Sequence, residues 1–169
     1  MSTIISINNL SYSYNKRKIF SNFSLDIEEG SWITIVGSNS SGKTTLVKLL
    51  LGLIQTDSIK YNLKNIRKDI GVIFENEKEN FMSDTVKDEL LLSLNPRNLT
   101  NQDIVEKYED ITDLLDITDL LDKNPNVLSS SELKRVLIAA SLLYNPKILI
   151  LDNALSNMSS KEKLDVLRM

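Results

Sequence analysis

The chain has 169 residues, of which 41% are hydrophobic and 25% charged, and its formal net charge is -3. The length suits one domain with its own buried core, the apolar runs are too short to span a membrane, and the acidic balance disfavours nucleic acid as a partner. The absence of cysteine and of a secretion-signal pattern in the first ten residues leads us to expect a cytoplasmic protein.

The first part of the chain has the pattern of β-strands. Residues 3–14 (TIISINNLSYSY) and 19–27 (IFSNFSLDI) alternate apolar and polar side chains, as half-buried strands do. Residues 31–37 (SWITIVG) are more continuously apolar, which predicts a buried strand that ends at Gly37. Residues 43–52 (KTTLVKLLLG) are apolar around most of a helix and predict a buried helix with Gly52 at its C-terminal cap.

The rest of the chain predicts a helical block between two core strands. The expected strands are 70–76 (IGVIFEN) and 147–152 (KILILD). Helical spacing governs three segments between them, which are 85–94 (TVKDELLLSL), 101–117 (NQDIVEKYEDITDLLDI) and 131–144 (SELKRVLIAASLLY). The sequence therefore predicts an α/β fold with a β-rich start and a helical insert.

The most specific motif is GSNSSGKT, residues 37–44, which fits the pattern G-x-x-x-x-G-K-[ST] between a predicted strand and a predicted helix. Gly37 and Gly42 let the backbone turn its N–H groups toward phosphate oxygens, next to the positive end of the following helix. Lys43 would reach the β and γ phosphates, and Thr44 would offer a hydroxyl to Mg²⁺. The alternative is a glycine turn that only opens a helix. The expected ligand is a magnesium nucleoside triphosphate.

Asp152 directly follows the apolar strand residues 148–151. A carboxylate at the end of a core strand beside a phosphate loop is suited to hold Mg²⁺, usually through water. Its alternative role is to cap the turn after the strand.

Taken together, these segments resemble the nucleotide-binding subunits of ABC transporters over the whole chain. Tyr14 stands where that family stacks an aromatic ring on adenine, and Glu75 stands at the position of the lid glutamine. LSSSE, residues 128–132, replaces the signature L-S-G-G-Q, and NALSNMS, residues 153–159, replaces E-P-T-S-G-L-D. The run from TVKDEL to the signature is most similar to ATPases of energy-coupling factor importers for vitamins, cobalt or nickel.

The resemblance implies a P-loop NTPase fold of the ABC ATPase type, with a RecA-like core, an N-terminal antiparallel β subdomain and a helical insert. Residues 1–75 and 145–169 would form the nucleotide-binding core with the β subdomain, and residues 76–144 would form a helical subdomain that carries the signature. The family extends beyond the position of Met169 and has a switch histidine there, whereas this sequence has no histidine. We therefore expect either a naturally short protein or a fragment, with a trimmed β hairpin before residue 68.

Asn153 stands where the family has the glutamate that orients or deprotonates the attacking water. An amide cannot accept that proton, and general-base help contributes about 10²- to 10⁴-fold, so we expect slow or absent hydrolysis. The expected phosphate and metal contacts of Lys43, Thr44 and Asp152 do not need the missing acid. We therefore expect ATP to bind.

The signature and the lid position also depart from the family pattern. Ser129 keeps the hydroxyl that would contact the nucleotide of an opposite subunit, but Ser130 and Ser131 replace two glycines and restrict close approach. Ser129 and Glu132 also fit a capping box at a helix start, and the two roles are compatible. Glu75, in place of the lid glutamine, keeps an oxygen for Mg²⁺ but loses the amide donor. The alternative role for Glu75 is that of a solvated surface acid.

The resemblance implies ATP and Mg²⁺ as cofactors. It implies two partners, a second ABC ATPase subunit (identical or different) and a transmembrane importer subunit. The importer subunit would dock near Glu75 and residues 81–94. The location would be cytoplasmic, peripheral on the inner face of the membrane. Alternative functions are a soluble nucleotide-dependent scaffold or regulator and an active ATPase that uses another base, for which Glu75 is the candidate. The expected nucleotide contacts are Tyr14, Gly37, Ser38, Asn39, Ser40, Ser41, Gly42, Lys43, Thr44, Thr45, Ser129, Ser130 and Ser131; the metal positions are Thr44, Asp152 and Glu75; and the catalytic positions are Asn153 and Glu75.

Overall fold

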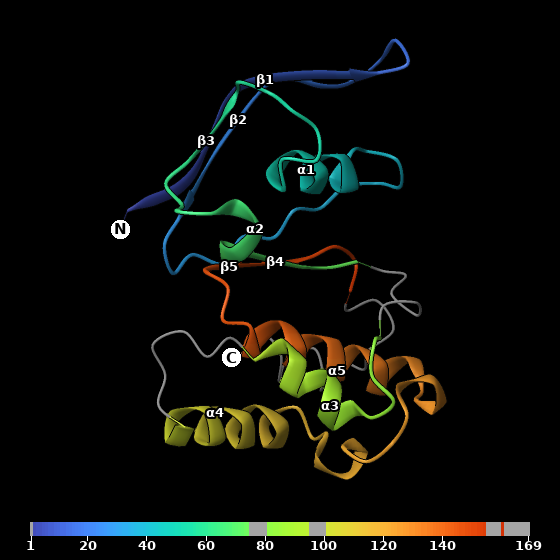
Figure 1. Cartoon of the computed structure of the whole chain (residues 1–169). Coiled ribbons are helices and arrows are strands. Elements are labelled where there is room, and N and C mark those ends of the chain that lie inside the picture. Colours follow the sequence, from blue (N-terminus) through green and yellow to red (C-terminus); the bar gives the residue numbers. More distant parts are fainter. Residues whose placement is uncertain (1, 75–80, 95–100, 155–159, 161–169) are drawn as a thin grey trace. The chain divides into compact units, whose positions relative to one another are not determined.

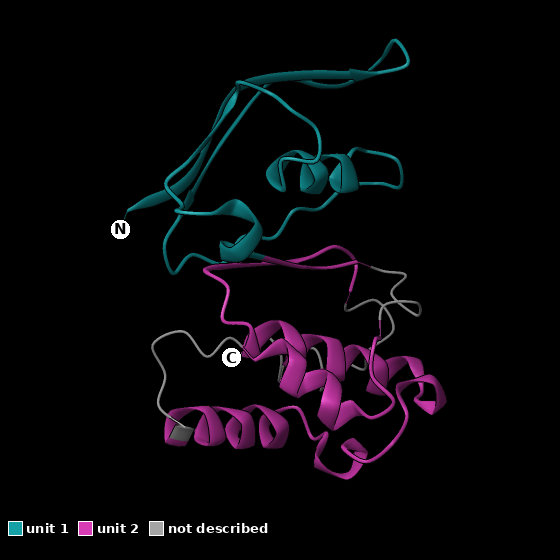
Figure 2. Cartoon of the chain, in the orientation of Figure 1, with its two compact units in different colours: residues 1–70 teal, residues 71–169 magenta. Residues whose placement is uncertain are grey.

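The computed structural model describes residues 2–74, 81–94, 101–154 and 160. The chain divides into two compact units, Met1–Ile70 and Gly71–Met169, which are described separately (Figure 2). The predicted division into 1–75 with 145–169 and 76–144 stays a prediction.

The first unit contains a three-stranded antiparallel sheet (Figure 1). Strand β1 (Thr3–Tyr14) lies between β2 (Arg17–Glu28) and the short β3 (Ile59–Tyr61). A two-residue turn joins β1 to β2, and both of its residues, Asn15 and Lys16, have positive φ (46° and 67°), as tight hairpins require. The predicted N-terminal antiparallel β subdomain is confirmed.

Helix α1 (Lys43–Leu50) buries four apolar side chains, Leu46, Val47, Leu49 and Leu50. The helix ends at Leu50, with Leu51 as its C-cap. The predicted capping glycine, Gly52, follows with a φ of 67°, the left-handed conformation that glycine adopts without strain. The Gly52 N–H donates to the Leu49 carbonyl (3.0 Å), and the Leu53 N–H donates to the Lys48 carbonyl (2.9 Å), so the end of the helix is satisfied. The Tyr61 hydroxyl donates to the carbonyls of Leu49 and Leu50 (3.1 Å each), which ties β3 to this helix end.

Residues 31–36 form no strand, so the prediction of a buried strand there is wrong for this structure. The apolar side chains of this segment are exposed, at 63% for Trp32, 40% for Ile33, 45% for Ile35 and 86% for Val36. The physical reason is that a strand of this composition needs neighbouring strands and covering helices. Within the described part of the first unit, the three strands pair only with one another.

The second unit combines a two-stranded sheet with helices (Figure 1). The sheet pairs β4 (Ile70–Ile73), whose first residue closes the first unit, with β5 (Ile148–Leu151), at the two places where core strands were predicted. The helical elements of this unit are α3 (Val86–Ser93), α4 (Asn101–Leu114), α5 (Ser130–Leu143) and the 3-10 turns η1 (Thr118–Leu120) and η2 (Pro125–Val127). The short helix α2 (Ile66–Asp69), just before β4, belongs to the first unit. No helix in the described ranges is long and apolar enough to cross a membrane.

One hydrophobic core holds the second unit together. Its buried residues come from the sheet, the helices and the turns between them: Ile73, Val86, Leu90, Ile111, Leu115, Ile117, Leu120, Val136, Ile138, Ala139, Leu143 and Ala154. Helix α4 ends at Leu114, three residues before the predicted end, because Asp116 has a left-handed φ of 51° that a helix cannot continue through. This turn lets Ile117 and Leu120 enter the core.

Candidate functional site: a phosphate loop and a signature helix

The phosphate loop lies in the first unit, between residues 31–36 and α1. Residues 37–41 are exposed, and Lys43 is half-buried at the first turn of α1. Its ammonium nitrogen donates to the carbonyl oxygens of Gly37 (2.8 Å) and Ser38 (2.9 Å). The loop therefore places a positive charge beside a helix N-terminus, which is the arrangement that attracts phosphate.

Two backbone conformations set the curvature of this loop. Ser40 and Gly42 have positive φ values, of 63° and 106°. The position of Gly42 also leaves no room for a side chain. A Cβ on Gly42 would lie 2.5 Å from Cγ2 of Ile19 and 3.2 Å from Cζ of Phe20. Gly42 is therefore required by close packing as well as by its backbone angle.

The other expected nucleotide contacts of the first unit are accessible. Tyr14 ends β1 with 63% of its surface exposed, so its ring is available for stacking. Thr44 is exposed and Thr45 half-buried in the first turn of α1. The exposed loop residues are Ser38, Asn39, Ser40 and Ser41. These assignments stay predictions.

Asp152 and Asn153 directly follow β5 in the second unit. The Asp152 N–H donates to the Ile73 carbonyl (2.9 Å), which extends the pairing with β4 and fixes the backbone of the carboxylate. Asp152 is half-buried and Asn153 exposed. Asn153 has a φ of 57°, a left-handed conformation that asparagine tolerates better than most residues.

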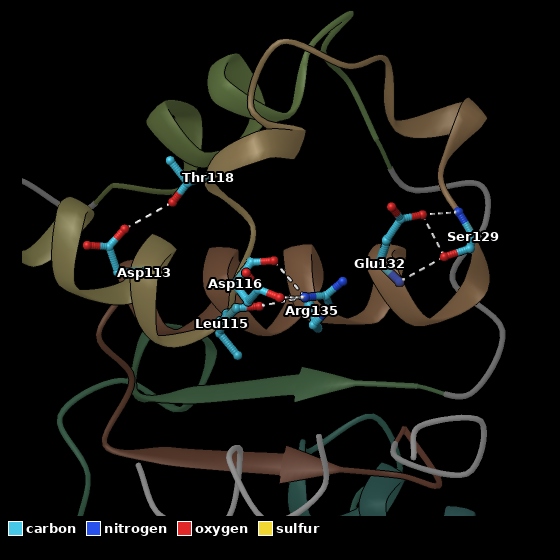
Figure 3. A network of polar contacts seen from close by, with 7 residues as sticks. All are labelled: Asp113, Leu115, Asp116, Thr118, Ser129, Glu132 and Arg135. Carbon is cyan, nitrogen blue, oxygen red and sulfur yellow. Dashed lines mark hydrogen bonds and ion pairs between the residues drawn. The ribbon is translucent and has the colours of Figure 1, made fainter. Parts of the chain in front are cut away.

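The signature segment starts α5, and its serine is engaged in a capping box (Figure 3). The Ser129 hydroxyl donates to Oε2 of Glu132 (2.6 Å) and accepts from the Glu132 N–H (3.3 Å). The same carboxylate oxygen accepts from the Ser129 N–H (2.8 Å). These hydrogen bonds lower the pKa of the Glu132 carboxyl. The predicted capping box is confirmed, and a contact of Ser129 with phosphate stays a prediction.

The two serines that replace the signature glycines lie inside the first turn of α5. Neither Ser130 nor Ser131 has a positive φ, so the helix start does not need glycine for its backbone angles. Their effect on a facing nucleotide would come from the added side chains alone.

Sequence reasoning missed Arg135, which joins α5 to the turn after α4 (Figure 3). One guanidinium nitrogen donates to the carbonyls of Leu115 (3.1 Å) and Asp116 (2.6 Å) and lies 3.3 Å from the Asp116 carboxylate. Thr118 donates to Asp113 (3.0 Å) across the same turn. The contact spans 19 residues of sequence, so no local pattern could have indicated it.

The predicted site residues fall into two groups. The phosphate loop and Tyr14 belong to the first unit, whereas Asp152, Asn153 and the signature serines belong to the second. Glu75 lies outside the described residues, as do residues 155–159 of the NALSNMS segment. Among the residues that are described, no three acidic or metal-ligating side chains cluster. Thr44 and Asp152 stay predicted metal positions.

Comparisons with known proteins identify the family of this chain. Residues 20–156 match the ABC transporter family model. The energy-coupling factor transporter ATP-binding protein EcfA of Aster yellows witches'-broom phytoplasma is 38% identical over 96% of this chain and 64% of its own length. EcfA1 of Leuconostoc mesenteroides is 34% identical over 89% of this chain and 59% of its own length.

Solved structures support the fold. The structure of cbiO1 from Clostridium perfringens, part of the ABC transporter complex cbiONQ, has a TM-score of 0.80 over 99% of this chain and 72% of that protein, at 23% identity. The ATP-binding subunit of another ABC transporter has a TM-score of 0.81 at 18% identity, over 98% of this chain and 72% of that protein. The predicted α/β fold of the P-loop ABC ATPase type is therefore confirmed. The chain, which spans less than two-thirds of the two relatives above, belongs to the ABC transporter family of ATP-binding proteins.

Proposed function

We propose that this chain is the ATP-binding subunit of an energy-coupling factor-type importer and that it binds Mg-ATP but hydrolyses it slowly or not at all. The observation that carries this proposal is that Lys43 donates to the carbonyls of Gly37 and Ser38 in the predicted phosphate loop, while Asn153 follows Asp152, the predicted magnesium ligand. The EcfA relatives support the transporter assignment.

The binding half of the proposal depends on charge and on oxygen ligands. Lys43 and the N-terminus of α1 would neutralise phosphate charge, and the exposed Tyr14 ring would stack on adenine. Hydroxyl and carboxylate oxygens are the ligands Mg²⁺ prefers, so the Thr44 hydroxyl and the Asp152 carboxylate suit this ion. Mg²⁺ bound there would neutralise charge on the β and γ phosphates.

The catalytic half depends on Asn153. Its side-chain amide can orient a water molecule through hydrogen bonds, but it cannot take the proton that the water loses. Without that base, turnover should fall by about 10²- to 10⁴-fold from the rate of an intact site. Any normal turnover in a complex would then come from the site of a partner ATPase.

The proposed partners are a second ABC ATPase subunit and a transmembrane subunit, which would place the chain at the inner face of the membrane. A soluble regulator that dimerises on ATP is the second candidate, and an ATPase that uses Glu75 as its base is the third. Co-purification of a membrane subunit favours the importer, whereas a soluble partner alone favours the regulator.

The decisive experiment measures ATP binding and phosphate release with Mg²⁺ for four forms of the chain. The unchanged chain should bind ATP saturably with little turnover, and Lys43→Ala should abolish binding. Asn153→Glu should raise turnover, whereas Asn145→Glu should not. Asn145 is the matched control because it is also exposed, with a φ of 59°, and lies outside the predicted site. Normal turnover by the unchanged chain, lost in Lys43→Ala, would overturn the assignment of Asn153.

A further inference from the structure

The tip of the β1–β2 hairpin carries three consecutive basic residues that the proposed function does not use. Lys16, Arg17 and Lys18 are all exposed, and their side chains form no hydrogen bond or ion pair with any described residue. Such charges are often only solvated surface groups. Arg17 differs from the other two because the hairpin pairs it directly with Tyr14, the predicted adenine-stacking residue.

The register of the hairpin puts Arg17 and Tyr14 on one face of the sheet. Residues that stand directly opposite each other in an antiparallel pair project to the same side, with Cβ atoms about 5 Å apart. Lys18 stands opposite Ser13 and therefore projects to the other side. Lys16 lies in the turn itself. Of the three basic residues, Arg17 thus shares a face with the Tyr14 ring.

The same face of the hairpin packs against the phosphate loop. Tyr12 lies two residues before Tyr14 on β1, so the two rings share a face, and Phe20 stands opposite Tyr12. A Cβ on Gly42 would lie 3.2 Å from Cζ of Phe20, and α1 follows Gly42 along this side of the hairpin (Figure 1). A nucleotide with its phosphates at the loop and its base on Tyr14 would therefore lie along the face that carries Arg17.

A guanidinium group is suited to a base that is stacked on a tyrosine. It is planar, always charged and weakly hydrated, so it packs against aromatic faces. Nucleobases stack on arginine side chains as they do on aromatic rings. A lysine would supply the same charge without the plane. The side chain at position 17 therefore has the chemistry for a contact with the base as well as the position for it.

We propose that Arg17 is a base-binding residue of the nucleotide site and holds the nucleobase beside Tyr14. The contact rests on the proposed function, because the bound nucleotide supplies the base. It differs from the contacts of the phosphate loop, which act on phosphate charge. Loss of Arg17 should therefore weaken the binding of ATP but not the binding of a triphosphate that carries no base.

Calorimetric titration with ATP and with inorganic tripolyphosphate, both in the presence of Mg²⁺, tests the contact. Arg17→Ala should weaken ATP binding about three- to tenfold and leave tripolyphosphate binding within about twofold. Lys18→Ala is the matched control, because it removes the same charge from the opposite face, and both ligands should bind within about twofold of the unchanged chain. Arg17→Lys should remain weakened for ATP, because it keeps the charge without the plane.

Three results would overturn the role of Arg17. They are unchanged ATP binding in Arg17→Ala, equal losses for ATP and tripolyphosphate in that variant, and full ATP affinity in Arg17→Lys. The last two would assign Arg17 to a general attraction of phosphate. If the unchanged chain shows no saturable ATP binding, the proposed function fails and the role of Arg17 fails with it. Saturable ATP binding that does not depend on Arg17 removes only the base contact and leaves the proposed function standing.

Discussion

Both units bury apolar side chains, but the first also leaves one continuous apolar segment exposed. In the second unit, residues from β4, α3, α4, α5 and the turns between them form one core cluster. In the first unit, the apolar segment that leads into the phosphate loop is exposed, with Val36 at 86%. Helices that follow one another closely can cover each other, whereas a strand of a central sheet depends on neighbours from distant parts of a chain.

This difference bears on function because the nucleotide loop follows the exposed segment. Gly37 continues directly from Val36, while the signature helix α5 belongs to the well-buried unit. The segment that leads into the phosphate loop therefore has less support from burial than the unit that contains Asp152 and Asn153.

The largest expected effect is a core truncation in the second unit. Leu90→Ala removes a fully buried side chain and should lower the free energy of unfolding by about 2–5 kcal/mol. Leu92→Ala on the same helix is the control, because Leu92 is 66% exposed and its loss should cost less than about 0.5 kcal/mol. Urea denaturation followed by circular dichroism measures both. Equal effects would contradict the burial difference within α3.

The next effect should fall on the phosphate loop. Gly42→Ala places a methyl group 2.5 Å from Ile19 at a φ of 106° and should destabilise the loop and α1 by about 1–3 kcal/mol. Gly30→Ala tests the backbone angle alone, because Gly30 has a φ of 69° and nothing within 4 Å of the new Cβ. We expect faster exchange of the Leu49 amide and weaker ATP binding in Gly42→Ala than in Gly30→Ala. The reverse order would show that packing against Ile19 does not shape the loop.

A smaller effect is expected at the start of the signature helix. Ser129→Ala removes one side of the capping box and should cost about 1 kcal/mol. The matched control is Ser130→Ala, one residue further into α5. Thermal unfolding of the three forms measures the difference. If both variants lose the same stability, the hydroxyl of Ser129 is not a cap.

The capping box also predicts a dependence on pH. Its hydrogen bonds lower the pKa of Glu132 below the ordinary value of 4.5, so the folded state binds this proton less readily than the unfolded state. The stabilisation is therefore complete above about pH 4.5 and is lost as the pH falls through the lowered value. Comparing unfolding at pH 7 and pH 3 for the unchanged chain and Glu132→Gln should show a smaller acid-induced loss in the variant. An equal loss would exclude Glu132 as its source.

The sequence predicted the elements whose signals are local. The capping box of α5, the glycine end of α1 and the apolar runs of β4 and β5 each stand in a few consecutive residues, and the structure confirms them. It did not predict the contacts of Arg135 with Leu115 and Asp116, because these join residues about twenty positions apart. The strand predicted at 31–36 is absent because apolar composition indicates a need for burial but not the partners that provide it.

The smallest expected effect is the sharpest test of the difference between the units. Because Ile35 is 45% exposed, Ile35→Ser should change the free energy of unfolding by less than about 0.5 kcal/mol. Trp32 is the only tryptophan of the chain and is 63% exposed, so acrylamide should quench its fluorescence readily. The control is Ile7→Ser, because Ile7 is only 1% exposed in β1 and the change should destabilise the same unit strongly. A shielded Trp32 together with a large loss in Ile35→Ser would mean that residues 31–36 are covered in solution, and the two units would then bury their apolar residues alike.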